Sequence, residues 1–375
     1  MKKYTLPVPN LYTMAKKIIL TVTNDLRYDQ RMNRICTSLA SAGYDVLLVG
    51  RKKRKSPPLA QQKFRQTRLT CFFEKGKLFY AEYNLRLFLF LLIRKTDCIC
   101  AIDLDTILPC YAVSVLKKIP RVYDAHEYFS QMEEVISRPA IYKTWYWIER
   151  RMIPRFPMGY TVCTSIADEF NKLYGVHYPV VRNVPYLREP GTPVKNEKFI
   201  LYQGAVNKGR GLEKLVEAMK EVPCKLVICG DGNAMVEIRE AIRFHALTDK
   251  IILTGMLPPE ELRKITASAY IALNPFQQLG LNQYFSLANK FFDYIQAGLP
   301  QVTMDYPEYR RINDQYAVAV LIEDIVPVLI ARALNNLLRN TVLYQTLRQN
   351  CERARIELNW EKEQQVLLQF YSSII

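Results

Sequence analysis

The chain has 375 residues, of which 49% are hydrophobic and 23% are charged. This length is enough for two domains of ordinary size, each with a sizeable core. The longest apolar run is the seven residues of Leu87–Ile93, whereas a membrane-spanning helix needs roughly 20. The sequence therefore predicts a soluble or peripheral protein.

The net charge of +16 is unevenly distributed. Residues 1–190 hold 31 basic and 16 acidic side chains, and residues 191–375 hold 21 and 20. The densest part, 51–100, has 13 basic and 3 acidic residues, including the run Arg51–Lys55. Such a patch suits an anionic membrane surface, with nucleic acid second because no nucleic-acid-binding motif accompanies it. The alternative is a solvated loop beside a buried helix at Leu85–Ile93.

The nine cysteines and three histidines show no zinc-binding spacing. The sequence predicts free thiols in a reducing cytosol and no metal site. The first 17 residues lack the apolar core of a secretory signal.

The first half begins with a βαβ pattern. Lys17–Thr23 is apolar and β-branched like a buried parallel strand, Arg27–Ala42 is helical and ends at Gly43, and Asp45–Val49 is the next strand. This beginning predicts a doubly wound α/β sheet. Further strands are expected at Cys98–Ile102, Arg121–Tyr123, Tyr160–Cys163 and Pro179–Val181.

Residues 187–197 contain two prolines, a glycine and no apolar pattern, which predicts an interdomain linker. A second α/β series follows, and Asn359–Phe370 is expected to be an amphipathic helix. Ligands of such sheets bind beyond the carboxyl ends of the strands, so the expected site is a cleft between two such domains. The predicted strands of this half are Phe199–Gln203, Lys225–Cys229, Ile251–Leu253, Tyr270–Leu273 and Gln301–Met304, and its helices are expected to start near Gly209, Asn233, Pro258 and Ser286.

Three segments at strand ends carry candidate functional residues. Asp124–Glu127 (DAHE) puts His126 at the carboxyl end of a strand. Gly204–Leu212 is a glycine-rich turn in which backbone N–H groups, with Lys208 or Arg210, could face a pyrophosphate. The turn at Gly230 is expected to be structural, lining a nucleotide cleft at most.

The segment Ser286–Pro300 (SLANKFFDYIQAGLP) carries the clearest pattern. Ser286 is a plausible N-cap, and Asn289 and Lys290 would lie in the first turn, where free N–H groups and the helix dipole favour an anion. Asp293, one turn later, could accept hydrogen bonds from a ribose diol. The alternative is an ordinary capped amphipathic helix.

These motifs together resemble glycosyltransferase family 4, the retaining enzymes of GT-B fold. That family carries two glutamates separated by seven residues; Asp293 stands at the second position and Phe285 at the first. Ala205 stands where the family has a phosphate-binding arginine, and Arg210-Gly211 replaces Lys-Gly. The resemblance implies that His126 faces the donor sugar.

The resemblance also implies an organisation and a function. Residues 1–187 would be a Rossmann-like acceptor domain, 188–358 a Rossmann-like nucleotide-sugar domain, and 359–375 a helix returning to the first domain. The implied enzyme is a metal-independent hexosyltransferase without a cofactor, making cell-surface polysaccharide, and the cysteine and charge patterns above add a cytoplasmic, membrane-peripheral location. Its donor is a nucleotide sugar and its acceptor a glycan or lipid-linked glycan.

The resemblance assigns catalytic roles to His126, Arg210 and Lys290, the last two stabilising the leaving diphosphate. Donor binding falls to Asp293, Ser286, Asn289, Gly204, Lys208 and Gly230.

Similar enzymes also have polar residues after the first strand, where Asp29, Gln30 and Arg31 would meet acceptor or phosphate; the alternative is that Asp29 caps the next helix. Asp103 and Asp105 have the spacing of metal-binding aspartate pairs. A metal is not expected there, because the segments predicted to bind the donor lie in the second half of the chain. Because Phe285 and Ala205 break the family pattern, a non-catalytic glycosyltransferase-like partner remains an alternative. A sugar-nucleotide epimerase is a further one.

Overall fold

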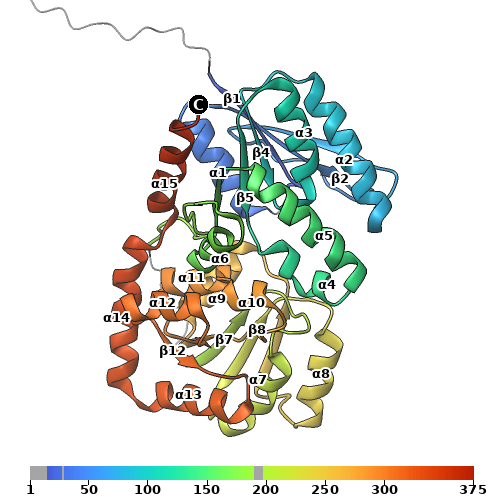
Figure 1. The fold of residues 1–375 in the computed structure, drawn as a ribbon. Coiled ribbons are helices and arrows are strands. Elements are labelled where there is room, and N and C mark those ends of the chain that lie inside the picture. Colours follow the sequence, from blue (N-terminus) through green and yellow to red (C-terminus); the bar gives the residue numbers. More distant parts are fainter. Residues whose placement is uncertain (1–14, 28, 190–196) are drawn as a thin grey trace, which may run out of the picture. The chain divides into compact units, whose positions relative to one another are not determined.

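A computed structural model describes residues 15–27, 29–189 and 197–375. The chain forms two compact units (Figure 1). The first holds the described residues up to Asp124 together with Arg155–Met158 and Leu367–Ile375, and the second holds Ala125–Pro154 and Gly159–Val366. This division by contacts groups residues 125–154 and 159–187 with the second unit, whereas the sequence suggested a boundary at 187. The predicted linker falls largely on residues 190–196, outside the described ones.

The first sheet has six strands in the order β3-β2-β1-β4-β5-β6. The four ladders from β3 to β5 are parallel. Strands β1 and β4 are almost wholly buried, which explains their unbroken apolar sequences. The strands are β1 (Lys17–Thr21), β2 (Asp45–Lys52), β3 (Arg65–Thr70), β4 (Cys98–Ile102), β5 (Arg121–Ala125) and β6 (Met158–Thr161).

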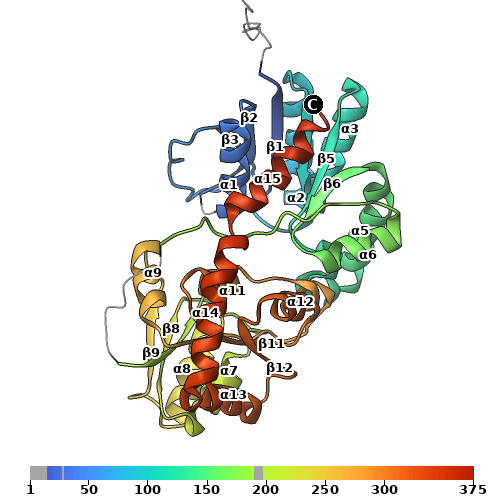
Figure 2. The ribbon, with the colours of Figure 1, turned by 90° about the vertical axis from the view of Figure 1, so that its left-hand side faces the viewer.

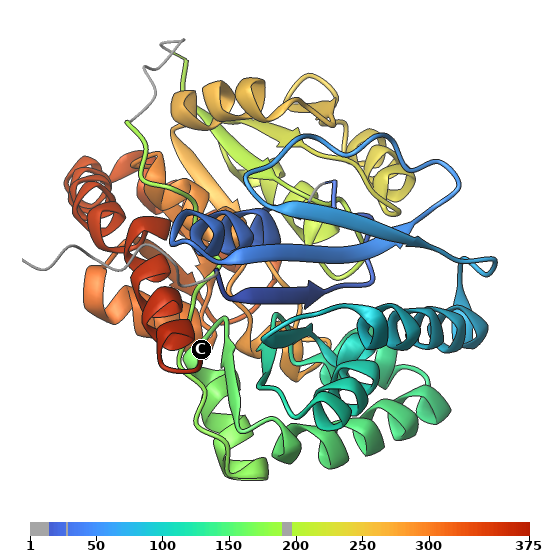
Figure 3. The ribbon, with the colours of Figure 1, turned by 90° about the horizontal axis from the view of Figure 1, so that it is seen from above.

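Three α-helices lie wholly in the first unit: α1 (Gln30–Ser41), α2 (Gly76–Ile93) and α3 (Ile107–Lys117), the last preceded by the short η1 (Leu104–Thr106). Helix α1 begins later than expected because the Asp29 carboxylate accepts a hydrogen bond from the Met32 N–H at 2.9 Å, which confirms the capping interpretation. Helices α2 and α3 pack side by side (Figures 1 and 3).

The second sheet has the order β12-β11-β10-β7-β8-β9, and all of its ladders are parallel. In both sheets the first strand lies centrally, with its second and fourth strands on either side. This is the doubly wound arrangement that the sequence predicted. The strands are β7 (Phe199–Gln203), β8 (Lys225–Cys229), β9 (Ile251–Gly255), β10 (Ile271–Asn274), β11 (Gln301–Met304) and β12 (Ala319–Ile322).

Helices cover this sheet, and its core includes Leu201, Ala272 and Tyr294. Helix α11 packs against α14 (Figure 2). The α-helices between Ala125 and Val366 are α4 (Glu133–Ile136), α5 (Pro139–Met152), α6 (Thr164–Tyr174), α7 (Leu212–Ala218), α8 (Met235–Phe244), α9 (Pro259–Ser268), α10 (Leu281–Phe285), α11 (Asn289–Gln296), α12 (Pro307–Tyr316), α13 (Pro327–Arg339) and α14 (Thr341–Glu357). Three single 3₁₀ turns, η2 (Phe129–Gln131), η3 (Ile153–Arg155) and η4 (Met219–Glu221), and the C-terminal α15 (Trp360–Ser372) complete the fold.

Several sequence expectations need correction. The predicted strand at Pro179–Val181 is a single bridge between Thr161 and Val180. Strand β3 was missed because its sequence, RQTRLT, lacks the apolar character of a buried strand; it lies at the sheet edge, half-exposed. All nine cysteines are unpaired, as expected. None of the helices among the described residues combines the length and apolar character needed to cross a bilayer.

Arg31 has a structural role that the sequence did not suggest. Its guanidinium donates to the Asp124 carboxylate at 3.0 Å, and both side chains are buried, with 4% and 0% exposed. The interpretation of Arg31 as an acceptor- or phosphate-binding residue is therefore corrected, because its side chain is enclosed in the first unit and paired with Asp124.

We predict that Arg31→Met lowers the free energy of unfolding by about 3–5 kcal/mol, because it leaves the Asp124 carboxylate buried without its cation. The matched control is Arg65→Met, which removes an exposed ion pair with Asp45 and should cost at most about 1 kcal/mol. Urea denaturation measures both. Equal losses for the two variants would contradict the prediction.

Candidate active site

The candidate site lies where the strand order of the second sheet reverses. Strands β7 and β10 are neighbours there, and the connections after them leave in different directions along the sheet. Loops at the carboxyl ends of such strands form the ligand crevice in doubly wound sheets. Gln203 ends β7, Gly204 follows it, and Phe276 follows β10.

Two glycines allow the backbones after β7 and after the neighbouring strand β8 to approach closely. Gly204 and Gly230 have φ of +120° and +153°. A Cβ on Gly230 would lie 1.8 Å from the carbonyl oxygen of Gly204, so no other residue fits without moving that backbone. The Gly204 N–H donates to the Cys229 carbonyl at 2.9 Å. This agrees with the structural interpretation of Gly230 and leaves an open backbone at Gly204, which is exposed.

The N-cap of helix α11 lies two residues later than the sequence suggested. Ser286 is not its N-cap: the Ser286 hydroxyl donates to the Gln283 carbonyl at 3.0 Å and ends the short helix α10. The cap is Ala288, which offers no side-chain hydrogen bond to α11. The prediction missed α10, whose final residues precede the expected cap. Lys290 still lies in the first turn of α11 and Asp293 one turn later.

Lys290 and Arg210 form a cationic pair around an aromatic ring. The Lys290 Nζ lies 3.8 Å from the centroid of the Tyr202 ring and 5.3 Å from that of Phe276, and the Arg210 guanidinium lies 4.4 Å from the Phe276 centroid. The Lys290 Nζ is also 3.4 Å from the position that a Cβ on Gly204 would take. The two cations thus adjoin the open backbone of the glycine turn.

Among the described residues, neither cation of this pair forms an ion pair with a carboxylate. Within residues 15–27, 29–189 and 197–375, neither Lys290 nor Arg210 has a carboxylate oxygen within 4.0 Å. Burial, and secondarily the charge of Arg210, holds the pKa of the Lys290 ammonium well below its usual value. Two partly buried like charges destabilise each other, so an anion bound between them would be strongly favoured.

Asp293 is oriented by a chain of side-chain hydrogen bonds. Its Oδ2 accepts from the Gln203 amide at 3.2 Å, and the Gln203 Oε1 accepts from the Thr266 hydroxyl at 2.7 Å. Asn289 accepts from the Asn183 amide at 2.7 Å. Gln203 and Thr266 were missed by sequence reasoning; the position of Gln203 as the last residue of a central strand was the available signal.

His126 and Glu127 follow β5 and lie in the second unit. The Asn282 side chain of α10 holds this turn at two points: its Oδ1 accepts from the Tyr128 N–H at 2.8 Å, and its amide donates to the Glu127 Oε2 at 3.1 Å. Burial raises the pKa of the Glu127 carboxyl, although the Asn282 amide, His126 and Arg210 act in the opposite direction. Glu127 is therefore electrostatically coupled to both His126 and Arg210. Nothing in the sequence around Asn282 indicated its role.

Other predicted residues lie elsewhere. Lys208 is largely exposed and pairs with Glu237 of α8 at 3.5 Å. Asp105 accepts a hydrogen bond from the Thr23 hydroxyl at 2.5 Å, in the first unit. Among the described residues there is no group of three or more His, Cys, Asp and Glu side chains arranged to hold a metal ion.

Residues 185–355 match the family described as glycosyl transferases group 1. The match covers somewhat less than half of the chain, and this part is similar to that family. It contains Gly204, Arg210, Lys290 and Asp293, and so nearly all of the geometry described above. A curated relative, alpha-D-kanosaminyltransferase of Streptomyces kanamyceticus, is 21% identical over 196 residues, or 46% of this chain and 51% of the relative. The chain therefore matches only about half the length of that relative.

Solved structures show the fold of the whole chain. Sucrose-phosphate synthase from Thermosynechococcus elongatus has a TM-score of 0.78 at 17% identity, covering 96% of this chain and 98% of that one. Anabaena HepE in complex with UDP and glucose has a TM-score of 0.74 at 13% identity, covering 96% and 100%. The fold is GT-B, with two Rossmann-like sheets, as the sequence predicted.

The raised pKa of Glu127 gives a testable pH dependence. The Glu127 carboxyl binds its proton more tightly in the folded state than in the unfolded state. Its contribution to the free energy of unfolding is therefore fully present below the unfolded-state pKa of about 4.3 and is lost as the pH rises through the folded-state pKa. Glu127→Gln removes the ionisation. We expect the variant to gain stability relative to the parent as the pH rises above the unfolded pKa of about 4.3, measured by urea denaturation at several pH values.

The control is Glu237→Gln. The pKa of Glu237 is lowered, first by a hydrogen bond from its own backbone N–H and then by Lys208. Its variant should change in the opposite direction, losing relative stability as pH rises. Parallel pH profiles for the two variants would contradict the assignment of Glu127.

Proposed function

We propose that this protein is a retaining glycosyltransferase that moves a sugar from a nucleotide-sugar donor to a glycan or lipid-linked acceptor. The observation that carries the proposal is the uncompensated pair of Lys290 and Arg210 beside the open backbone of Gly204. Such a site favours an anion, and a sugar nucleotide carries one in its diphosphate. The match of residues 185–355 to group 1 glycosyl transferases supports the same conclusion.

Each residue has a proposed role. Arg210, Lys290 and the first turn of α11 stabilise the charge that develops on the leaving diphosphate. Asp293, oriented by Gln203, accepts hydrogen bonds from the ribose hydroxyls, and Gly204, which has no side chain, leaves room for the diphosphate. His126 contacts the donor sugar, with Glu127 beside it.

Of the four remaining donor-binding predictions, Gly230 shapes the turn beside Gly204, and the other three lie at the edge of the proposed site. Asn289 begins α11 and flanks the diphosphate position through its contact with Asn183. Ser286 and Lys208 remain predictions. To bind the donor, Lys208 would have to break its ion pair with Glu237.

The reaction that we propose needs neither a metal nor a cofactor. The nucleotide sugar is a substrate, and the charge that a metal would neutralise falls on Arg210 and Lys290. Retention follows from the resemblance to family 4 and implies attack from the face of the leaving group, without an enzymic nucleophile. UDP is the first nucleotide to test, because the structure of the similar HepE contains UDP and glucose; a hexose is the proposed sugar.

We propose that the enzyme acts in cell-surface polysaccharide synthesis, on the cytoplasmic face of an anionic membrane, through residues 51–95. The support is the basic excess of the first half of the chain, 31 against 16, compared with 21 against 20 in the second half.

The decisive experiment is a thermal-shift panel of sugar nucleotides followed by product analysis with the stabilising donor. Donor turnover with transfer to an acceptor, or slow hydrolysis with retained anomeric configuration, supports the proposal. Binding without any turnover would favour a non-catalytic partner, which Phe285 and Ala205 make the specific alternative. An epimerised nucleotide sugar formed without acceptor would indicate an epimerase.

The cationic pair gives a prediction in which activity and stability change in different directions. Lys290→Met and Arg210→Met should each lower turnover at least roughly a hundredfold, because each removes a charge aimed at the transition state. The melting temperature of Lys290→Met should hold or rise, because the variant no longer buries a destabilised ammonium. The control Lys214→Met removes an exposed partner of Glu217 and should leave turnover unchanged. Normal turnover in both site variants would locate the donor elsewhere.

Asp293→Ala should weaken nucleotide binding by roughly 1.5–3 kcal/mol, the range for hydrogen bonds to a charged group. Calorimetry with UDP measures the loss, and Asp249→Ala, at an exposed aspartate, is the matched control. Unchanged affinity in a folded Asp293→Ala variant would remove the ribose assignment.

Metal independence has its own test. Turnover should persist in EDTA, because two side-chain cations and a helix N-terminus replace the metal. Loss of turnover in EDTA that magnesium or manganese restores would make Asp103 and Asp105 candidate ligands again.

A further inference from the structure

Helix α2 is apolar on two opposite faces. Phe79, Tyr83, Leu87 and Leu91, spaced by four residues, are buried in the first unit. Every helix of this length also has a side that points away from its core, and polar residues normally occupy it. Here the side away from the core carries leucines. Those with large exposed fractions are Leu78 (60%), Leu85 (60%), Leu89 (53%) and Leu92 (40%), followed by Ile93 (79%).

The spacing shows that these leucines form one stripe. Steps of seven, four and three residues separate the four leucines, which places them within about a quarter of the helix circumference at 3.6 residues per turn. Single exposed leucines are ordinary on a protein surface, whereas a contiguous apolar stripe marks an interaction site. On the neighbouring helix α3, Leu116 is also 62% exposed.

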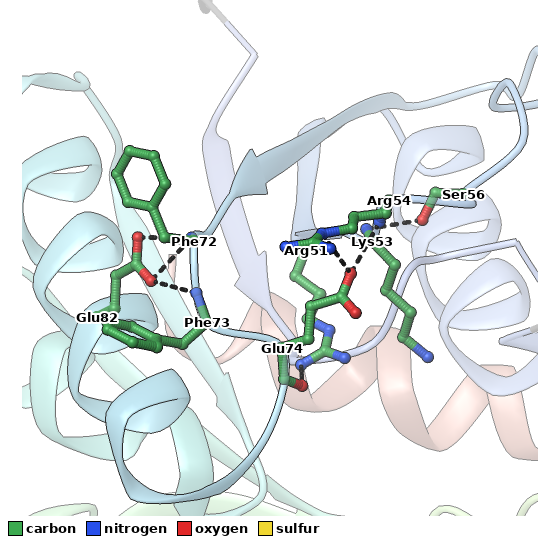
Figure 4. A network of polar contacts seen from close by, with 8 residues as sticks. All are labelled: Arg51, Lys53, Arg54, Ser56, Phe72, Phe73, Glu74 and Glu82. Carbon is green, nitrogen blue, oxygen red and sulfur yellow. Dashed lines mark hydrogen bonds and ion pairs between the residues drawn. The ribbon is translucent and has the colours of Figure 1, made fainter.

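The turn that precedes α2 continues the apolar surface. Phe72 is 80% exposed and Phe73 is 46% exposed. Both of their N–H groups donate to the Glu82 carboxylate of α2, at 2.9 and 3.0 Å (Figure 4). The turn is therefore fixed to α2 by its backbone, with the Phe72 ring left exposed.

Basic residues lie next to this turn. Glu74 accepts from the Arg51 guanidinium through its carbonyl, at 3.2 Å, and from the Arg54 N–H through its carboxylate, at 3.1 Å (Figure 4). The run predicted from the sequence needs one correction: Arg51 packs over the Phe79 ring at 4.1 Å and serves the fold. Residues 52–55 are exposed.

Cations also flank the leucine stripe at both ends. Lys75 and Lys77 are exposed at the start of α2, and Arg94 and Lys95 are exposed just after its end. Long basic side chains at the ends of an apolar surface can keep their charges in water or among headgroups while the apolar part is buried. An occupant with an apolar interior and an anionic surface complements this arrangement, and an anionic bilayer has both.

We propose that the exposed face of α2 and the Phe72–Phe73 turn insert into the interfacial layer of an anionic bilayer, with residues 52–55, 75, 77, 94 and 95 against the headgroups. The inference rests on the membrane location proposed above and deepens it: the contact is an inserted apolar face, in addition to electrostatic attraction. Charge captures the protein at the surface, and the leucines retain it there when salt screens the charges.

The test is flotation of the full-length protein with vesicles of neutral phosphatidylcholine, or with the same lipid containing 30% phosphatidylglycerol, in 0.1 M and 1 M salt. The insertion variant is Phe72→Ser/Leu85→Ser/Leu89→Ser. Its control is Phe244→Ser/Val342→Ser, two apolar residues of the second unit that are 84% and 76% exposed. A charge variant replaces residues 52–55 with Ser. Melting temperatures check that each variant folds.

We expect the parent to bind anionic vesicles and to remain partly bound in 1 M salt. The insertion variant should partition at least roughly tenfold more weakly, and its residual binding should disappear in 1 M salt. The charge variant should bind anionic vesicles more weakly than the parent at 0.1 M salt but keep the salt-resistant part of the binding, and the control should bind like the parent.

Failure of the parent to float with anionic vesicles would overturn the inference, as would equal binding by parent and insertion variant. Dimers of the parent that the insertion variant converts to monomers, without vesicle binding, would also overturn it and assign the face to a second copy of the chain. Donor turnover in detergent-free buffer is measured on the same samples. Turnover without vesicle binding would contradict the membrane insertion and leave the proposed enzyme activity intact. Vesicle binding without turnover would contradict the proposed enzyme activity and leave the membrane insertion intact.

Discussion

The proposed site in the second unit depends on two neighbouring cations, neither of which forms an ion pair with a carboxylate among the described residues. Lys290 and Arg210 share the Phe276 ring, and burial lowers the pKa of the lysine. A structure selected only for stability would pair or expose such charges, because an unpaired ammonium in a low-dielectric setting is costly. The diphosphate that we propose as the ligand would offset this cost through its own negative charge. The donor binding and the metal-free mechanism that we propose both depend on this arrangement.

The doubly wound topology makes this arrangement possible. Parallel strands bring the residues after β7 and β10 to one edge of the sheet, although about seventy positions separate them in sequence. The glycines then remove the side chains that would fill that edge. Since the Gly204 carbonyl lies 1.8 Å from the Cβ position of residue 230, the two turns are mutually dependent. Asp293 is held by Gln203 and Thr266 in the same way, through contacts between elements far apart in the chain.

In the first unit, helix α2 has one buried apolar face and one exposed apolar face. The buried face of α2 completes a core, and a single carboxylate, Glu82, fixes the aromatic turn that precedes it. Arg51 belongs to that packing, and the residues after it remain on the surface. A count of basic residues in the sequence does not distinguish them. The structure shows that Arg51 packs against Phe79, whereas residues 52–55 remain exposed.

The sequence by itself determined the elements whose causes are local. The apolar strands β1, β7, β8 and β11, the Asp29 cap, and the place of Lys290 and Asp293 on one helix all follow from short-range periodicity and capping chemistry. The resemblance to family 4 added the GT-B fold. Strand β3 was not predicted because an edge strand needs few apolar residues. Helix α10 was not predicted because five residues are too few to show a helical periodicity of apolar residues.

Only the tertiary structure decided which polar side chains meet. Arg31 pairs with Asp124, Lys208 with Glu237, and Asn282 with the turn at Glu127, across separations of 93, 29 and 155 positions. No local pattern encodes such partners, because packing of whole elements sets the distances over which charges and hydrogen bonds act. The sequence identified Lys290 and Arg210 as separate cations. That both lie beside the Phe276 ring became clear only from the packing of β7, β10 and α11.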